Sequence, residues 1–307
     1  MAKYRDNLPQ LGDRVFLADG GIETTLIFHD ALDLPDFAAF VLLADGGGRE
    51  ALRRYFRPYV ELARYSGTGI VLETPTWRAS PDWAARQGYA DERLAEANRA
   101  AVDLLVELRD EYETRAAPIV VSGCLGPRGD GYAPDTMMTA AEAEAYHSGQ
   151  VAVFADSEAD LVTAITMTHT GEAIGIARAA AARDVPCVIS FTVETDGRLP
   201  SGDQLGDAVL AVDAATDSTP SYYMVNCAHP THFDATVRAG NSWVNRVRGL
   251  RANASTMSHA ELDEGDPADL AARYASLCEE LPQLSVLGGC CGTDHRHIDA
   301  IRRACVT

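Results

Sequence analysis

The sequence predicts an α/β fold consisting of a single closed (β/α)8 barrel, the TIM barrel. Short runs rich in leucine and β-branched residues alternate with longer segments of helical period, which is the pattern of βα units around a parallel sheet. Eight such runs with eight crossovers in 307 residues fit a closed barrel. A doubly wound sheet would usually have fewer strands and a glycine-rich first turn. No Pro/Ser-rich linker divides the chain, so we expect residues 1–307 to form one domain.

The predicted strands are short apolar runs bounded by turn-forming or polar residues. In chain order they are Val15–Ala18, Ile70–Glu73, Ile119–Ser122, Leu161–Ile165, Cys187–Val193, Tyr222–Asn226, Val247–Ala252 and Leu284–Leu287. If these strands form a barrel, the loops that follow them meet at one mouth, where TIM barrels carry their chemistry.

Helix signals lie between the predicted strands. Apolar residues with i, i+3 and i+4 spacing, which share one helix face, are Leu94, Ala97, Ala101, Leu104, Leu105, Leu108 and Tyr112. Thr139 and Glu142 form a capping-box pattern at the start of a later helix. Asp266 before Pro267 is an N-cap followed by a proline at the first helical position, and Asp294 precedes the last predicted helix.

Composition and charge restrict the class of partner. The chain has 26 Lys+Arg against 45 Asp+Glu, a net charge of −19, and 47% hydrophobic residues, which excludes a disordered chain. Its negative charge repels phosphate backbones and anionic lipid, so we expect a small-molecule ligand rather than nucleic acid or membrane. The start, MAKYRDNLPQ, has no apolar segment of a signal peptide, and no run of 18 apolar residues occurs. We therefore expect a cytoplasmic protein, and the sequence predicts no particular oligomeric state.

Three cysteines are expected to meet at the barrel mouth. Cys227 follows the sixth predicted strand, and the adjacent pair Cys290 and Cys291 follows the eighth. Three thiolates would leave a fourth tetrahedral position of Zn²⁺ open, as in catalytic zinc sites. The glycines that flank the pair allow two successive side chains to point at one ion, which a regular strand forbids. An odd number of cysteines, seven in all, also suits metal binding in a reducing compartment better than a disulfide framework.

Other interpretations of these segments remain open from the residues alone. Free cysteines are often buried as small apolar side chains, and Cys227 by itself fits that description. Further possible metal ligands are Cys124, His229, His232, His295 and His297. His297 also fits a position at the start of the last helix.

Four motifs give the chain a family resemblance. DGGIETTL at Asp19–Leu26, SGCLGPRGD at Ser122–Asp130, the pair Asn226–Cys227 and GGCCGTDHRHI at Gly288–Ile298 occur in this order across nearly the full length. With these motifs the chain resembles the homocysteine S-methyltransferase family. The resemblance implies a barrel in which the three cysteines bind Zn²⁺ and an acceptor thiol takes the fourth site. It also implies transfer of a methyl group from a sulfonium-type donor to that thiol, with homocysteine giving methionine as the favoured reaction.

Substrate contacts are expected from side chains at the ends of the predicted strands. Asp19, Glu73 and Glu194 follow strands one, two and five, where a carboxylate could bind the ammonium of an amino acid or attract a cationic sulfonium. The resemblance places an amino-acid-binding role on Asp19. Trp77 could stack on a sulfonium through a cation–π contact. Asn226, beside the first cysteine, completes the predicted substrate site.

One position departs from the family pattern. Family members typically have a glutamate at the end of strand four that recognises the substrate amino group, whereas this chain has Ile165 there. Either Glu194 replaces that carboxylate, or the acceptor is a different small thiol or selenol. A zinc hydrolase that activates water is an alternative of another class, although three thiolates make zinc a poorer Lewis acid than histidine ligands would. A non-catalytic binding barrel is the remaining alternative.

Overall fold

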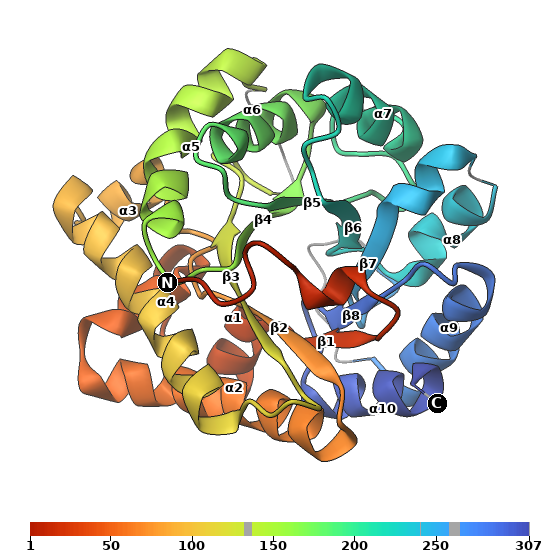
Figure 1. The fold of residues 1–307 in the computed structure, drawn as a ribbon, viewed down its shortest axis with the longest axis horizontal. Coiled ribbons are helices and arrows are strands. Elements are labelled where there is room, and N and C mark those ends of the chain that lie inside the picture. Colours follow the sequence, from red (N-terminus) through yellow and green to blue (C-terminus); the bar gives the residue numbers. More distant parts are fainter. Residues whose placement is uncertain (132–136, 240, 258–264, 307) are drawn as a thin grey trace.

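The eight strands of the computed structural model form one closed parallel barrel, in the order β1 to β8 (Figure 1). The structure describes residues 1–131, 137–239, 241–257 and 265–306. The strands are β1 Phe16–Ala18, β2 Gly69–Glu73, β3 Ile119–Leu125, β4 Leu161–Met167, β5 Cys187–Phe191, β6 Tyr222–Asn226, β7 Val247–Ala252 and β8 Val286–Gly289. Pairing of Phe16 in β1 with Val286 in β8 closes the barrel, so the predicted fold class is confirmed.

Helices surround this ring of strands (Figure 1). They are α1 Ile22–Thr24, α2 Gly46–Ser66, α3 Pro81–Arg86, α4 Asp91–Tyr112, α5 Ala140–Ala155, α6 Thr170–Ala181, α7 Leu205–Ala215, α8 Pro230–Arg238, α9 Pro267–Glu280 and α10 His295–Cys305. The three predicted helix starts are confirmed, since Thr139 forms a capping box with Glu142, and Asp266 and Asp294 are N-caps. Within the described residues, no helix is both long enough and apolar enough to cross a membrane.

Two apolar cores follow from the alternation of side chains along the strands. The larger core contains strand residues that face the helices, such as Leu17, Leu72 and Val121. The smaller core contains alternate residues such as Phe16, Tyr222 and others that fill the barrel interior. These side chains fill the barrel interior below its mouth.

Several strand ends differ from the predicted ones. β6 and β7 match the prediction, but β8 begins and ends two residues later than the predicted Leu284–Leu287, because Gly288 and Gly289 pair with β7 and continue the ladder. β3 and β4 extend beyond their predicted ends at Ser122 and Ile165. The added residues of β3 pair with β4, and Met167 at the end of β4 pairs with Phe191 of β5. Pairing with a neighbouring strand therefore extends both strands beyond the ends that the sequence indicates.

Candidate active site

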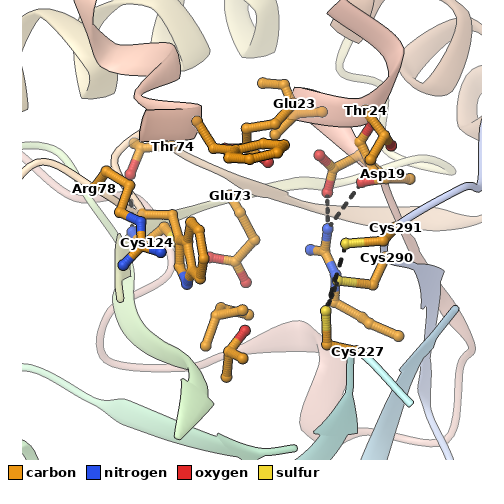
Figure 2. A pocket seen from close by; sticks show the side chains of 18 of the residues that line it. Asp19, Glu23, Thr24, Glu73, Thr74, Arg78, Cys124, Cys227, Cys290 and Cys291 are labelled. Carbon is orange, nitrogen blue, oxygen red and sulfur yellow. Dashed lines mark hydrogen bonds and ion pairs between the residues drawn. The ribbon is translucent and has the colours of Figure 1, made fainter. Parts of the chain in front are cut away.

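A cavity of about 220 Å³ opens at the carboxyl ends of the strands (Figure 2). Its walls come from β1, β2, β3, β4, β6, β7 and β8 and the loops that follow them. The residues that line it are Asp19, Gly20, Gly21, Ile22, Glu23, Thr24, Phe37, Glu73, Thr74, Trp77, Arg78, Cys124, Asp130, Ile165, Thr166, Cys227, Arg251, Cys290 and Cys291. The site thus lies where TIM barrels carry their chemistry.

The three predicted cysteines meet on one wall of this cavity (Figure 2). Cys290 Sγ lies 3.2 Å from Cys227 Sγ, which lies 3.5 Å from Cys291 Sγ. All three sulfurs lie within 4.8 Å of one another, and they form the one such group of potential metal ligands among the described residues. Segments more than 60 residues apart in sequence therefore combine into one cluster of sulfur atoms.

This cluster fits a zinc ion. Zn–S bonds of about 2.3 Å in a tetrahedral site place the sulfurs roughly 3.8 Å apart, so the two separations of 3.2 and 3.5 Å would need to widen by only a few tenths of an ångström. The backbone is adapted to the cluster, because Cys227 adopts a left-handed conformation (φ 55°) that few non-glycine residues tolerate. A Cβ at Gly289 would lie 2.1 Å from Thr293 Oγ1, so only glycine fits directly before Cys290. Strain and close packing of this kind are typical of functional sites.

The three thiols share their protons unequally. Hydrogen bonds with Cys227 and Cys291 lower the pKa of Cys290 well below its ordinary value. The same contacts raise the pKa of Cys227 well above it. A cation at the centre of the cluster would stabilise thiolates on all three.

Asp19, which lines the cavity, is held by a buried ion pair with Arg251. Its Oδ1 accepts from Arg251 Nη2 at 2.6 Å and its Oδ2 accepts from the Tyr55 hydroxyl at 3.0 Å. Burial raises the pKa of Asp19, while Arg251 and Tyr55 oppose that shift. Arg251 Nε also donates to the carbonyl of Gly289, so the ion pair ties β1 and β7 to the residue before Cys290.

Arg251 was not anticipated in the sequence analysis. It lies in a strand that was predicted correctly, and a charged residue in a parallel strand buried on both faces is itself a signal of a functional site. Glu23, within the DGGIETTL motif, was also missed. It lines the cavity, and burial raises its pKa to about 7.

Glu73 lies at the end of β2, and its carboxylate enters the cavity (Figure 2). The residue is 7% exposed, and its Oε2 is buried with no hydrogen-bond partner among the residues that the structure describes. Burial raises the pKa of Glu73 to about 7, against the opposing effects of Arg251 and the Ser122 hydroxyl. A group whose pKa lies near neutrality in a cavity is a typical feature of a functional site.

Trp77 also lines the cavity, but the side chain of Arg78 already lies over its ring. The guanidinium of Arg78 lies 4.0 Å from the ring centroid of Trp77 and 3.6 Å from that of Trp83. Arg78 donates to the carbonyl of Gly129 at 3.2 Å as well. The cation–π contact expected for a sulfonium is therefore made, on one face of Trp77, by Arg78.

Two predicted substrate residues, Asn226 and Glu194, are not among the described residues that line the cavity. Asn226 is fully buried, and its Oδ1 accepts from the Thr166 amide at 2.9 Å and the Ser190 hydroxyl at 2.6 Å. Its Nδ2 lies 3.9 Å from Cys290 Sγ, so Asn226 positions the cysteine wall. Glu194 lies three residues beyond β5, in the loop before α7, because β5 ends earlier than predicted. Glu194 therefore lies outside the lining of the cavity, and the prediction that it replaces the missing carboxylate of strand four has no support from this geometry.

The other potential metal ligands lie outside the sulfur cluster. Cys124 lines the cavity from β3 but does not belong to the group of three cysteines. His229 caps α8 and His232 Nε2 lies 2.9 Å from the carbonyl of Thr256. His297 forms the capping box of α10, as the sequence allowed.

Comparison with known proteins agrees with this geometry. The family model of homocysteine S-methyltransferase matches residues 16–305. Among solved structures, the homocysteine methyltransferase MmuM from Escherichia coli is similar in its oxidised form, with a TM-score of 0.79 and 22% identity over 98% of this chain and 99% of that chain. Its metallated form has a TM-score of 0.75 and 21% identity, over 94% of this chain and 96% of that chain. No relative was found among curated proteins.

The MmuM structures, at this level of identity, establish the fold. The family model does more, because it covers nearly the whole chain, including the strand ends that carry the three cysteines. This chain therefore belongs to the homocysteine S-methyltransferase family and is a methyltransferase.

Proposed function

We propose that this protein is a zinc-dependent S-methyltransferase that transfers a methyl group from a sulfonium-type donor to homocysteine, giving methionine. The observation that carries the proposal is the group of three cysteine sulfurs within 4.8 Å at the cavity wall. The family match supports the reaction class, and the metallated form of the E. coli methyltransferase supports a metal in this fold.

Cys227, Cys290 and Cys291 would hold the zinc ion, and Zn²⁺ when bound lowers the pKa of a thiol so that a thiolate is available at neutral pH. In the transfer, the acceptor sulfur forms a bond to the methyl carbon while the bond from that carbon to the sulfonium sulfur breaks. The electron pair of the broken bond stays on the donor, which leaves as a neutral thioether, and the thiol proton goes to solvent.

The remaining side chains orient the reactants. Asn226 fixes Cys290, and the ion pair between Asp19 and Arg251 fixes the strand end that carries it. Glu23 and Glu73 add negative potential to the cavity, which favours the approach of a cationic sulfonium. Transfer neutralises that cation, so the product thioether is held less strongly than the donor.

A different small thiol or selenol is the second candidate acceptor, because an apolar side chain, Ile165, lines the cavity where the family pattern has a glutamate. Both candidates use the same sulfur cluster. They differ only in what the cavity must recognise beyond the thiol.

Metal analysis together with a methyl-transfer assay tests the proposal. We expect about one zinc per chain and methionine formation from homocysteine with S-methylmethionine or S-adenosylmethionine, detected by mass spectrometry. Cys227→Ala, Cys290→Ala and Cys291→Ala should each lose zinc and turnover while the barrel remains folded, because these side chains lie at the mouth.

Cys278→Ala is the matched control, because Cys278 lies on α9 outside the sulfur cluster. It should keep both zinc and activity. The metal assignment is wrong if zinc-replete protein carries no zinc, or if the triple alanine variant keeps full activity. Turnover with another thiol or selenol but not with homocysteine would favour the second candidate.

A further inference from the structure

The buried polar atoms of cavity-lining residues that have no hydrogen-bond partner within the described part of the structure include two of opposite character. One is the acceptor Oε2 of Glu73, and the other is the donor Nη1 of Arg251. Both residues line the cavity and both are more than nine-tenths buried. Buried polar atoms in folded proteins nearly always have hydrogen-bond partners, so two orphans in one cavity indicate groups that a ligand completes.

Neighbouring charged side chains do not form hydrogen bonds with Glu73 Oε2 or Arg251 Nη1 within the described part of the structure. Arg251 attracts the Glu73 carboxylate, but its Nη2 and Nε are engaged by Asp19 and by the carbonyl of Gly289. Arg78, the other arginine that lines the cavity, lies between two indole rings and donates to the carbonyl of Gly129. A carboxylate oxygen and a guanidinium nitrogen without hydrogen bonds are both costly to bury, and a ligand with both charges would relieve both costs.

We propose that Glu73 and Arg251 form the subsite for the zwitterionic head group of an α-amino-acid thiol, with the ammonium on Glu73 Oε2 and the carboxylate on Arg251 Nη1. This inference rests on the proposed function, and it assigns the recognition of the acceptor's amino group to β2 in a chain that has Ile165 on β4. The carboxylate of Glu73 and the three cysteines point into the same space (Figure 2). A single small ligand can therefore present its sulfur to the cysteines and its charged end to this pair.

An ammonium explains the orphan oxygen better than the sulfonium centre of the methyl donor does. An ammonium has three N–H donors, whereas a sulfonium sulfur has none and can offer only charge. Ile165 and Cys124 also line the cavity and supply no charge of their own to compete for the head group. The raised pKa of Glu73 supports the assignment, because it is the effect expected of a buried carboxylate before its cation arrives.

Calorimetric titration of the zinc-loaded protein with three thiols tests the assignment without turnover. Homocysteine has both charges, 4-mercaptobutanoate lacks the ammonium, and 3-aminopropane-1-thiol lacks the carboxylate. The wild type should bind homocysteine at least tenfold more tightly than either analogue. Glu73→Gln should weaken the binding of homocysteine and of 3-aminopropane-1-thiol at least tenfold, because one charge-assisted hydrogen bond is lost. It should change the dissociation constant of 4-mercaptobutanoate less than twofold.

Matched variants separate charge from shape. Glu194→Gln makes the same chemical change outside the cavity and should leave all three dissociation constants unchanged. Glu73→Asp keeps the charge on a shorter side chain, so it should bind homocysteine and 3-aminopropane-1-thiol more tightly than Glu73→Gln does.

Equal weakening of all three thiols in Glu73→Gln, or no weakening of any, would overturn the inference while homocysteine methylation by the wild type still supports the proposed function. If the wild type neither binds nor methylates homocysteine, both ideas fail. If it binds homocysteine as described but transfers no methyl group, the subsite stands and the proposed reaction is wrong.

Discussion

Replacing Arg251 with methionine should lower the free energy of unfolding by about 3–5 kcal/mol. The Arg251 and Asp19 side chains are 8% and 2% exposed, and 2.6 Å separates Nη2 from Oδ1. Methionine fills similar space but removes the charge and the hydrogen bonds to Asp19 and to the carbonyl of Gly289. The loss is large because Asp19 then remains buried without its cation, which is the costly way to break a buried ion pair.

A second substitution tests the electrostatic origin of this loss. Asp19→Asn in the Arg251→Met background removes the uncompensated carboxylate and keeps an oxygen that can accept from Tyr55. The double variant should recover a substantial part of the loss, so its cost should be well below the sum of the single variants. Arg273→Met is the surface control, because Arg273 pairs with Asp269 at 3.0 Å with both side chains at least one-third exposed, and such pairs contribute ~0–1 kcal/mol.

Urea unfolding followed by far-ultraviolet circular dichroism measures these differences, provided that the m-value stays constant among the variants. The reasoning is refuted if the free energy of unfolding of Arg251→Met lies within 1 kcal/mol of the wild-type value, which is the difference expected for a surface ion pair. It is equally refuted if the costs of Arg251→Met and Asp19→Asn simply add in the double variant, because additivity means that the two side chains do not interact.

Protonation of Glu73 and the metal ligand set give further predictions. The carboxyl pKa is 4.5 in the reference state and about 7 in the fold, so the folded chain holds its proton between these values and stability should fall as the pH rises through that window. The free energy of unfolding of Glu73→Gln should therefore equal that of the wild type near pH 4 and exceed it at pH 8, by an amount on the order of 3 kcal/mol at most. Thermal unfolding curves of the two proteins that differ equally at both pH values would contradict this prediction. Cys124→Ser should keep about one zinc per chain, since Cys124 lies outside the sulfur cluster, and a loss of bound metal by elemental analysis would instead make it a ligand.

Local patterns were sufficient to predict much of this protein. Short apolar runs that alternate with segments of period 3.6 indicated eight strands and the barrel class, because parallel strands are buried on both faces and the surrounding helices on one. Capping residues such as Thr139 and Asp266 predicted helix starts for a reason that is equally local, since the cap bonds to amides two or three residues away. The cysteines could be assigned to one mouth because all strands of a parallel barrel end on the same side.

Only the tertiary structure decided which polar groups face the cavity and which partners they have. Glu194 and Glu73 look alike in sequence, as carboxylates near the ends of strands, but β5 ends two residues before the predicted Val193 and only Glu73 lines the cavity. The pairing of Arg251 with Asp19 joins residues 232 positions apart, and no local pattern encodes such a contact. Strand ends and ion pairs of this kind depend on neighbouring strands that are distant in sequence, because the energy of a buried charge is set by everything packed around it.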